Sequence, residues 1–419
     1  MTSLGLLLRR DFALLWWSGL VSMTGSWMLA IALPIHVYQL TGSAIATSGA
    51  LIAATAPRLL LGSVAGTFVD RWDRRTTMVV GNALLAAGLV PLWLVGSADL
   101  VWIVYAVAAF ESTVALFVGP AENAMLPALV DPDDLLAANL LNSLNNNVAR
   151  LGGPVLGGFL ATVSGLGAVA AADMVTFVLA AVLVALISAR GAPRSDGPVA
   201  PEDAWRGLWR EWALGLAFVK DRTTLRVLFL VVALMSVGEG VMGALFVVFV
   251  SDVLLGNATH YGTLVSAQAV GSLIGLAVLV PWTRRLRADR VLGLAFVCFG
   301  AIDLAIFNAP AVVPRFELEV ALFVAVGIPI VLIGPSLMTL LQTEVPDRYR
   351  GRVLGSLGTT EALFRVSGLV LGGLLAGPFG VVAILNVQGA AQVLAGAVVL
   401  RMLSRALAAP ARRTVTLSA

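Results

Sequence analysis

The stretch Gly62-Ser-Val-Ala-Gly-Thr-Phe-Val-Asp-Arg-Trp-Asp-Arg-Arg75 lies between two apolar runs, Ser48 to Leu61 and Thr76 to Val95. Because a chain inside a bilayer must satisfy its backbone hydrogen bonds internally, both runs are predicted to be transmembrane helices. Gly62 and Gly66 are four residues apart on one helix face, where the missing side chains let a neighbouring helix approach. The stretch therefore marks the end of one span and a very short charged loop.

The loop carries mixed charge in a small space, with Asp70, Arg71, Asp73, Arg74 and Arg75 inside six positions. Such a loop can form a gating latch, in which ion pairs and helix-end contacts hold in one conformation and break in another. The alternative is that the arginines only anchor the loop on the cytoplasmic side. A repeat elsewhere in the chain favours the latch.

The second half of the chain repeats two patterns of the first half. Gly271-Ser-Leu-Ile-Gly275 repeats Gly62-Ser-Val-Ala-Gly66 after 209 residues, and a basic loop follows again. Arg150-Leu-Gly-Gly-Pro-Val-Leu-Gly-Gly aligns with Arg365-Val-Ser-Gly-Leu-Val-Leu-Gly-Gly after 215 residues. Separations of about half the chain indicate a duplicated membrane unit, with two halves of similar topology facing each other across a pathway.

Composition supports the same class. Of 419 residues, 59% are hydrophobic and only 12% are charged, and the mean hydropathy is +0.94. Soluble domains carry roughly 25% charged residues, so this is a polytopic membrane protein. Twelve spans of about 20 to 25 residues use up the chain and leave no room for a soluble catalytic domain. The single cysteine, Cys298, excludes an internal disulfide and a cysteine-based metal cluster.

The predicted fold is an all-α integral membrane protein of twelve transmembrane helices in two pseudo-symmetric six-helix halves. Residues 1–190 form the first half, 191–226 a cytoplasmic linker with an amphipathic surface helix, and 227–419 the second half with a basic tail. The termini, the linker and alternate loops hold nearly all basic residues, while the other loops hold only Arg315. By the positive-inside rule both termini are cytoplasmic, and the basic character reports orientation rather than nucleic-acid binding.

Ionisable side chains inside spans are costly, so each is a functional hypothesis. The predicted spans contain Arg58, Glu111, Arg150, Asp173, Glu239, Asp303, Glu361 and Arg365. Glu111 and Arg150 fall near mid-membrane and are predicted to pair, as are Glu361 and Arg365, one helical turn apart.

A polar stripe accompanies Arg150. Its residues follow one another at three- to four-residue spacing, which places them on one face of the helix, and this face is predicted to line the pathway. Its members are Asn139, Asn142, Asn146 and Arg150.

Glu239 has no basic residue within a turn, which suits a group that takes up and releases a proton. The alternative is a protonated glutamate that bonds a neighbouring helix. Glu111 is the second candidate for proton coupling. For Asp173 and Asp303 we expect structural pairing, and Arg58 suits either an anionic substrate or a carboxylate on another span.

Two glycine clusters predict close helix packing, and Pro154 adds a bend or hinge to the first. The clusters comprise Gly152, Gly153, Gly157 and Gly158 in the fifth span, and Gly368, Gly372, Gly373 and Gly377 in the eleventh.

The sequence lacks the residue patterns of nucleotide-binding and metal-binding sites. The only lysine, Lys220, has no glycine-rich context, so no phosphate-binding loop is present, and His36 and His260 are isolated. We expect no cofactor and no metal site, and a proton gradient as the energy source.

Together these features resemble the major facilitator superfamily. Gly62–Arg75 looks like its loop 2–3 signature, and the Arg150 repeat looks like the span-five motif of its antiporters. The chain is more narrowly similar to the macrolide-efflux-like branch of drug–proton antiporters, which also includes siderophore exporters. The matching pieces are Arg10-Asp-Phe-Ala-Leu-Leu-Trp, Ala32-Leu-Pro-Ile-His-Val-Tyr-Gln-Leu-Thr-Gly-Ser, Gly119-Pro-Ala-Glu-Asn-Ala-Met-Leu-Pro, Asp173-Met-Val-Thr-Phe and Arg350-Gly-Arg-Val.

Two positions depart from the family pattern. The branch often carries an acidic residue in the first span, where this chain has Ser26 after Gly25, and this shifts proton coupling toward Glu111 and Glu239. The second-half counterpart of the latch has Leu279 at the position of Asp70.

The resemblance implies a monomeric, proton-coupled efflux carrier in the cell membrane, acting by alternating access on small amphipathic molecules such as drugs, secondary metabolites or siderophores. The partners would be the substrate, protons and the lipid bilayer, with no nucleic acid. A proton-linked importer of a small metabolite remains an alternative. An integral-membrane enzyme or lipid-handling protein is a further one, against which the missing paired-aspartate and histidine motifs count; we therefore predict that the protein is not an enzyme.

Overall fold

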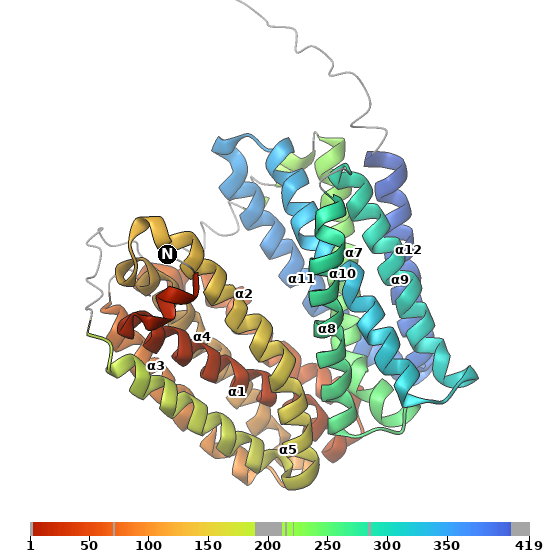
Figure 1. Cartoon of the computed structure of the whole chain (residues 1–419). Helices are drawn as coiled ribbons and strands as arrows, with labels where there is room; N and C mark the ends of the chain where they lie inside the picture. The colour runs from red at the N-terminus through yellow and green to blue at the C-terminus, as the bar shows by residue number, and fades with distance from the viewer. Residues whose placement is uncertain are drawn as a thin grey trace, which may run out of the picture.

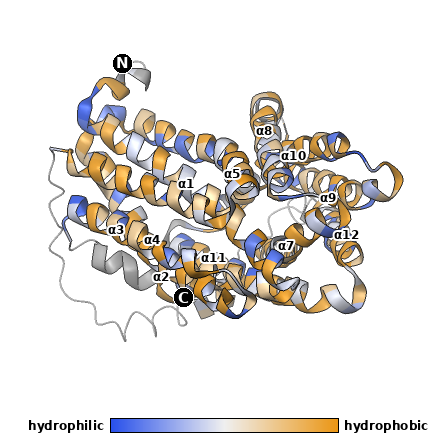
Figure 2. Cartoon of the chain, turned by 90° about the horizontal axis from the view of Figure 1, so that it is seen from below, coloured by the Kyte–Doolittle hydropathy of each residue, from blue (hydrophilic) through white to orange (hydrophobic). Residues whose placement is uncertain are grey.

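The computed structural model describes residues 3–69, 72–188, 212–213, 216–220, 222–283 and 286–403. These form two helical bundles, one from each half of the chain (Figure 1). Hydrophobic residues dominate the helices of both bundles, as expected for surfaces that contact lipid (Figure 2). Most of the predicted linker, including its surface helix, lies outside the described residues.

The first bundle follows the predicted spans closely, with short 3₁₀ turns near helix ends. Its elements are η1 (Ser3–Leu8), α1 (Arg10–Thr41), α2 (Ala44–Val69), α3 (Arg74–Gly88), η2 (Val90–Leu94), η3 (Ala98–Leu100), α4 (Val101–Leu129), η4 (Pro132–Asp134) and α5 (Leu135–Ala185).

The second bundle, like the first, consists of long helices that follow one another along the chain. Two of them, α7 and α12, end in short π-helical segments. Its elements are α7 (Thr223–Val248), η5 (Phe249–Val253), α8 (Ala258–Thr283), α9 (Ala288–Val312), α10 (Phe316–Glu344), α11 (Asp347–Phe379), α12 (Val381–Val398) and η6 (Val399–Leu403).

Helix α5 contains two membrane crossings. The backbone breaks at Gly165 (φ 75°, ψ −176°), and the two segments run back past each other (Figure 1). This conformation is accessible essentially only to glycine. Eleven helices in the described residues are long and apolar enough to span a membrane. Since α5 crosses twice, the expected twelve spans of an all-α membrane fold are confirmed.

The duplication extends to the turns. Gly380 lies 215 residues after Gly165, has a similar backbone (φ 80°, ψ 148°), and connects α11 to α12. The fifth-to-sixth and eleventh-to-twelfth connections are therefore built alike, with a glycine at the one position that needs it.

The glycine clusters make equivalent contacts in the two bundles. Gly157 packs on the backbone of α1 at Met28, and Gly372 packs on α7 at Val241. One residue later, Gly158 contacts Ala258 of α8 and Gly373 contacts Ser48 of α2, each across the gap between bundles. The predicted close packing is present in both clusters, and each cluster serves two neighbours.

The two bundles contact each other at one end and diverge toward the other (Figure 1). At the end where they meet, which we call the closed end, the Tyr38 hydroxyl donates to Asp252 at 2.6 Å. The hydroxyl of Thr259 lies 3.0 Å from that of Thr162. The first described residues and the end of α12 lie at the opposite, open end (Figure 1).

Candidate functional site

Arg150 links the two bundles. Its Nη2 donates to Oε1 of Gln268 on α8 at 2.9 Å. The predicted Glu111–Arg150 ion pair is wrong, because no ion pair joins these described residues and the guanidinium is directed at the other bundle. The sequence pattern identified Arg150 but could not identify Gln268, an uncharged polar residue one turn before Gly271.

Arg365, the counterpart of Arg150, has an acidic partner. Its Nη1 lies 3.9 Å from Oε2 of Glu239 on α7, with side-chain exposures of 50% and 38%. The predicted Glu361–Arg365 pair is therefore wrong, and so is the expectation that Glu239 is unpaired. Glu361 is exposed and lies near enough to Glu239 to interact with it electrostatically. Two acids and one guanidinium thus gather where α7 meets α11.

The polar stripe on α5 lies mainly away from the packed core. Asn139 and Asn146 are exposed, and Asn142 and Arg150 are half-buried. The fully buried amide in this region is Asn145, which donates to the Trp16 carbonyl at 2.9 Å. Because Arg150 reaches α8, this face of α5 is directed toward the second bundle.

Several carboxyl groups lie between helices of the first bundle, among them those of Asp173, Glu111 and Glu122, the last beside Gly19 of α1. Asp173 is fully buried and lies against Gly25 of α1, where a Cβ atom would overlap its Oδ1. Glu111 of α4 lies against Gly88 of α3, where a Cβ atom would be 2.9 Å from its Oε1. Asp173 Oδ2 and Glu111 Oε1 have no hydrogen-bond partner among the described residues.

The second bundle has a related but different cluster. Gln388 is 215 residues after Asp173 and packs against Gly238, just before Glu239. Its Nε2 donates to Oδ2 of Asp303 at 3.1 Å. The position of the buried aspartate in the first bundle is therefore occupied by an amide in the second. The 215-residue offset is the sequence signal by which Gln388 could have been found.

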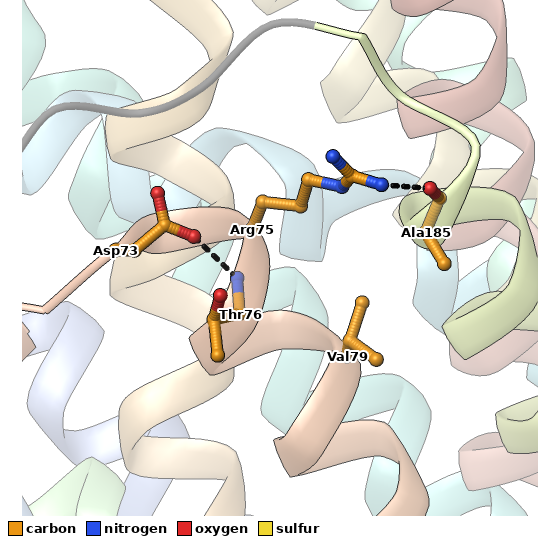
Figure 3. A pocket seen from close by; sticks show the side chains of 5 residues that line it. All are labelled: Asp73, Arg75, Thr76, Val79 and Ala185. Atoms are coloured by element: carbon orange, nitrogen blue, oxygen red, sulfur yellow. Dashed lines mark hydrogen bonds between the residues drawn. The ribbon is translucent and has the colours of Figure 1, made fainter.

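The described latch residues hold the first bundle together at its open end. Arg74 donates to the Ala124 carbonyl at 2.8 Å. Arg75 donates to the carbonyl of Ala185 (Figure 3). Asp73 caps α3 by accepting from the Thr76 amide at 2.8 Å, beside a cavity of about 520 Å³ (Figure 3). These contacts stay within one bundle.

Other predicted site residues are less well placed by the structure. Asp70 and Arg71 lie outside the described residues, as do the surroundings of Gly62 and Gly66, although α2 itself continues to Val69. Their second-half counterparts Gly271 and Gly275 pack on α10.

Arg58 and Pro154 complete the predicted set. Arg58 is exposed on α2 and has no ion-pair partner among the described residues. Pro154 lies inside α5, and its carbonyl meets Gly262 of α8. The described residues contain no group of three potential metal ligands.

A two-bundle membrane fold with charged side chains between the bundles defines a secondary transporter of the major facilitator type. The chain belongs to the transmembrane secretion effector family of the major facilitator superfamily, whose model matches residues 1–414. The protein is therefore a multi-pass membrane transporter and not an enzyme, as predicted.

Curated relatives and solved structures agree with this class. The chain is 27% identical to macrolide efflux protein A of Streptococcus pyogenes, over 88% of this chain and 90% of that protein. It is 28% identical to multidrug efflux pump Tap of Mycolicibacterium fortuitum, over 89% and 90%. A bacterial homologue of the iron transporter ferroportin, solved in an inward-facing state, shares the fold with a TM-score of 0.74 at 17% identity, over 94% of this chain and 99% of that one.

Proposed function

We propose that the protein is a proton-coupled efflux carrier that exports small amphipathic molecules, such as drugs, secondary metabolites or siderophores, by alternating access. The carrying observation is that the bundles meet at one end only, with charged side chains on the helices between them. Relatives named for macrolide and multidrug efflux support the direction and the substrate class.

The open end would face the cytoplasm. The basic loops and both termini lie on that side by the positive-inside rule, so the protein would sit in the cell membrane with both ends inside. The structure would then be the inward-facing state, ready to accept substrate from the cytoplasm. The contacts at the closed end, from Tyr38 to Asp252 and from Thr162 to Thr259, would shut the outer side.

Substrate would bind between the bundles near Glu239 and Arg365. A 3.9 Å ion pair that is partly exposed can be opened by a ligand carrying its own charge, because water already screens part of the attraction. Uptake of a proton by an intramembrane carboxyl, with Glu239 and Glu111 as candidates, would drive the return of the empty carrier.

The test uses inverted vesicles that contain the protein, are acidified inside and carry a pH-gradient dye. Adding erythromycin, ethidium, a siderophore and a sugar one at a time should dissipate the gradient for at least one exporter substrate. Vesicles with Arg365→Gln serve as the matched variant, in which the response should weaken. If labelled solute instead accumulates in intact cells that express the protein, the carrier is an importer.

A further inference from the structure

We infer that Glu111 and Asp173 form the proton-binding pair of this transporter, inside the first bundle, whereas Glu239 with Arg365 in the second bundle serves the substrate. The inference rests on the proposed function and assigns two of its steps to different halves. Four observations support it.

The first observation is the enclosure of Asp173. Its side chain has no exposed surface, and Oδ2 has no partner among the described residues. The Thr176 hydroxyl lies 3.0 Å from Oδ1 but 2.7 Å from the Asp173 carbonyl oxygen, and it has only one hydrogen to donate. A bare carboxylate here would lack the hydrogen bonds that a buried charge requires, so the site favours the protonated acid.

The second observation concerns Glu111. Its Oε1 is also buried without a partner, against Gly88 of α3. Glu111 lies near enough to Asp173 for the two carboxyl groups to repel each other when both are charged. Asp173 is fully buried and Glu111 is partly buried, and two such like charges near each other are unfavourable without a cation, so the pair favours binding at least one proton.

The third observation is that the described part of the chain places no cation beside the pair. Helices α1 and α3 present glycines, Gly25 and Gly88, to the pair, and among the described residues the charged group that acts on Glu111 is Asp173. No basic side chain of the described residues lies within ion-pair distance of Glu111 or Asp173. Within the described part of the chain, charge compensation would therefore come from a proton.

The fourth observation is the contrast with Glu239. Arg365 lies beside it, so this carboxylate has a cationic partner, which Glu111 and Asp173 lack among the described residues, although Glu361 also acts on Glu239. Both side chains are also partly exposed, where a substrate can reach them. The repeat supports assigning proton binding to the first bundle alone. Asp173 in the first bundle corresponds to Gln388 in the second, and a glutamine side chain does not ionise.

The proposed step is simple in its balance. One proton binds to a carboxylate oxygen of the pair, and the same proton leaves when the bundles rearrange, with no other bond made or broken. Helix α1 is the element placed to transmit the change. It contacts Asp173 at Gly25, and three residues later it packs at Met28 on Gly157 of α5, next to the inter-bundle contact of Gly158.

The first test does not depend on transport. Infrared difference spectra of the purified protein in membranes, near neutral pH, compare the wild type with E111Q/D173N and with E239Q. We expect the double variant to lose carboxylic-acid carbonyl intensity that E239Q retains. If the double variant keeps this intensity, or if E239Q alone removes it, the assignment is wrong.

The second test measures coupling in proteoliposomes. Glu111→Gln and Asp173→Asn should each lose pH-driven accumulation of erythromycin or ethidium but retain downhill counterflow of the same probe. Asp303→Asn, which alters a buried aspartate of the second bundle, is the control that should keep both. If the pH-driven accumulation persists in both single variants, the pair is not the proton site.

The two tests separate this inference from the proposed function. Loss of infrared intensity in the double variant, together with no transport of any probe by the wild type, would support the proton pair and contradict the proposed substrates. Gel filtration of each variant shows whether it is folded, and the single variants provide a second route if the double variant aggregates.

Discussion

The phenol of Tyr38 donates to the Asp252 carboxylate at 2.6 Å and so joins α1 to η5 at the closed end. Bonds between a neutral donor and a charged acceptor are short and contribute about 1.5 to 3 kcal/mol. The two groups belong to different bundles, so the bond exists only while this end is closed. It therefore biases the conformational equilibrium as well as the stability of the fold.

At the residue scale we predict that Tyr38→Phe shifts the transporter toward the state open at this end. Loss of about 1.5 kcal/mol corresponds to a roughly tenfold change in the population ratio. Spin labels at the closed end report the distance between the bundles, once the single cysteine, Cys298, has been replaced by serine. The matched control is Tyr105→Phe, because Tyr105 donates to Ala46 within the first bundle. Equal shifts in both variants would contradict the assignment.

Helix α5 contacts two helices through one glycine cluster. One of them, α1, belongs to the same bundle, and the other, α8, belongs to the second bundle. Gly153 and Gly157 pack on α1 inside the bundle, whereas Gly158 packs on α8 of the other bundle. A methyl group at Gly157 should therefore loosen the bundle itself, since overpacking against backbone costs about 1 to 3 kcal/mol. A methyl group at Gly158 would instead meet Ala258 of the other bundle, so we expect its effect to be confined to conformations in which this end is closed.

At the element scale we predict that Gly158→Ala prevents full closure while leaving the melting temperature nearly unchanged. An added Cβ atom would overlap the carbonyl oxygen of Ala258, which is backbone and cannot turn away. A cysteine introduced between the bundles near the closed end should therefore react faster with a thiol reagent added on that side. Gly152→Ala is the control, because a Cβ atom there meets nothing within 4 Å. A large loss of thermal stability in Gly158→Ala alone would show that the contact is needed for folding instead.

On the scale of the whole molecule, alternating access requires a second set of contacts that shuts the open end. Helix α3 begins there, and its residues Arg74 and Arg75 hold it to the rest of the first bundle. In this conformation the bundles are apart at that end, so a latch between them would form only after the rocking motion.

We predict that Asp70→Asn slows transport and depopulates the state closed at the end that is open here, because it removes the acidic residue of the proposed latch. Distances between labels at the open end, measured with and without substrate, report that state. Asp133→Asn, in the short turn before α5, is a control of equal charge change. If Asp70→Asn is present at the normal protein level and transports as the wild type does, the latch hypothesis is wrong. The loop arginines would then serve only to anchor the loop at the membrane surface.

Sequence pattern by itself determined the membrane class, the twelve crossings and the duplication. These depend on local composition and on spacing along the chain: a span must be apolar and about 20 residues long, and a turn such as that at Gly165 or Gly380 must be glycine. The candidate residues were found in the same way, because charges inside apolar runs stand out.

Only the tertiary structure decided which groups meet. Arg150 and Arg365 occupy equivalent positions in the repeat but have different partners. Arg150 donates a hydrogen bond to Gln268, and Arg365 forms an ion pair with Glu239. Glu361 is one helical turn from Arg365 and still does not pair with it. The physical reason is that partner choice depends on the rotation and close approach of neighbouring helices, which side-chain packing across distant segments determines and which spacing within one helix does not record.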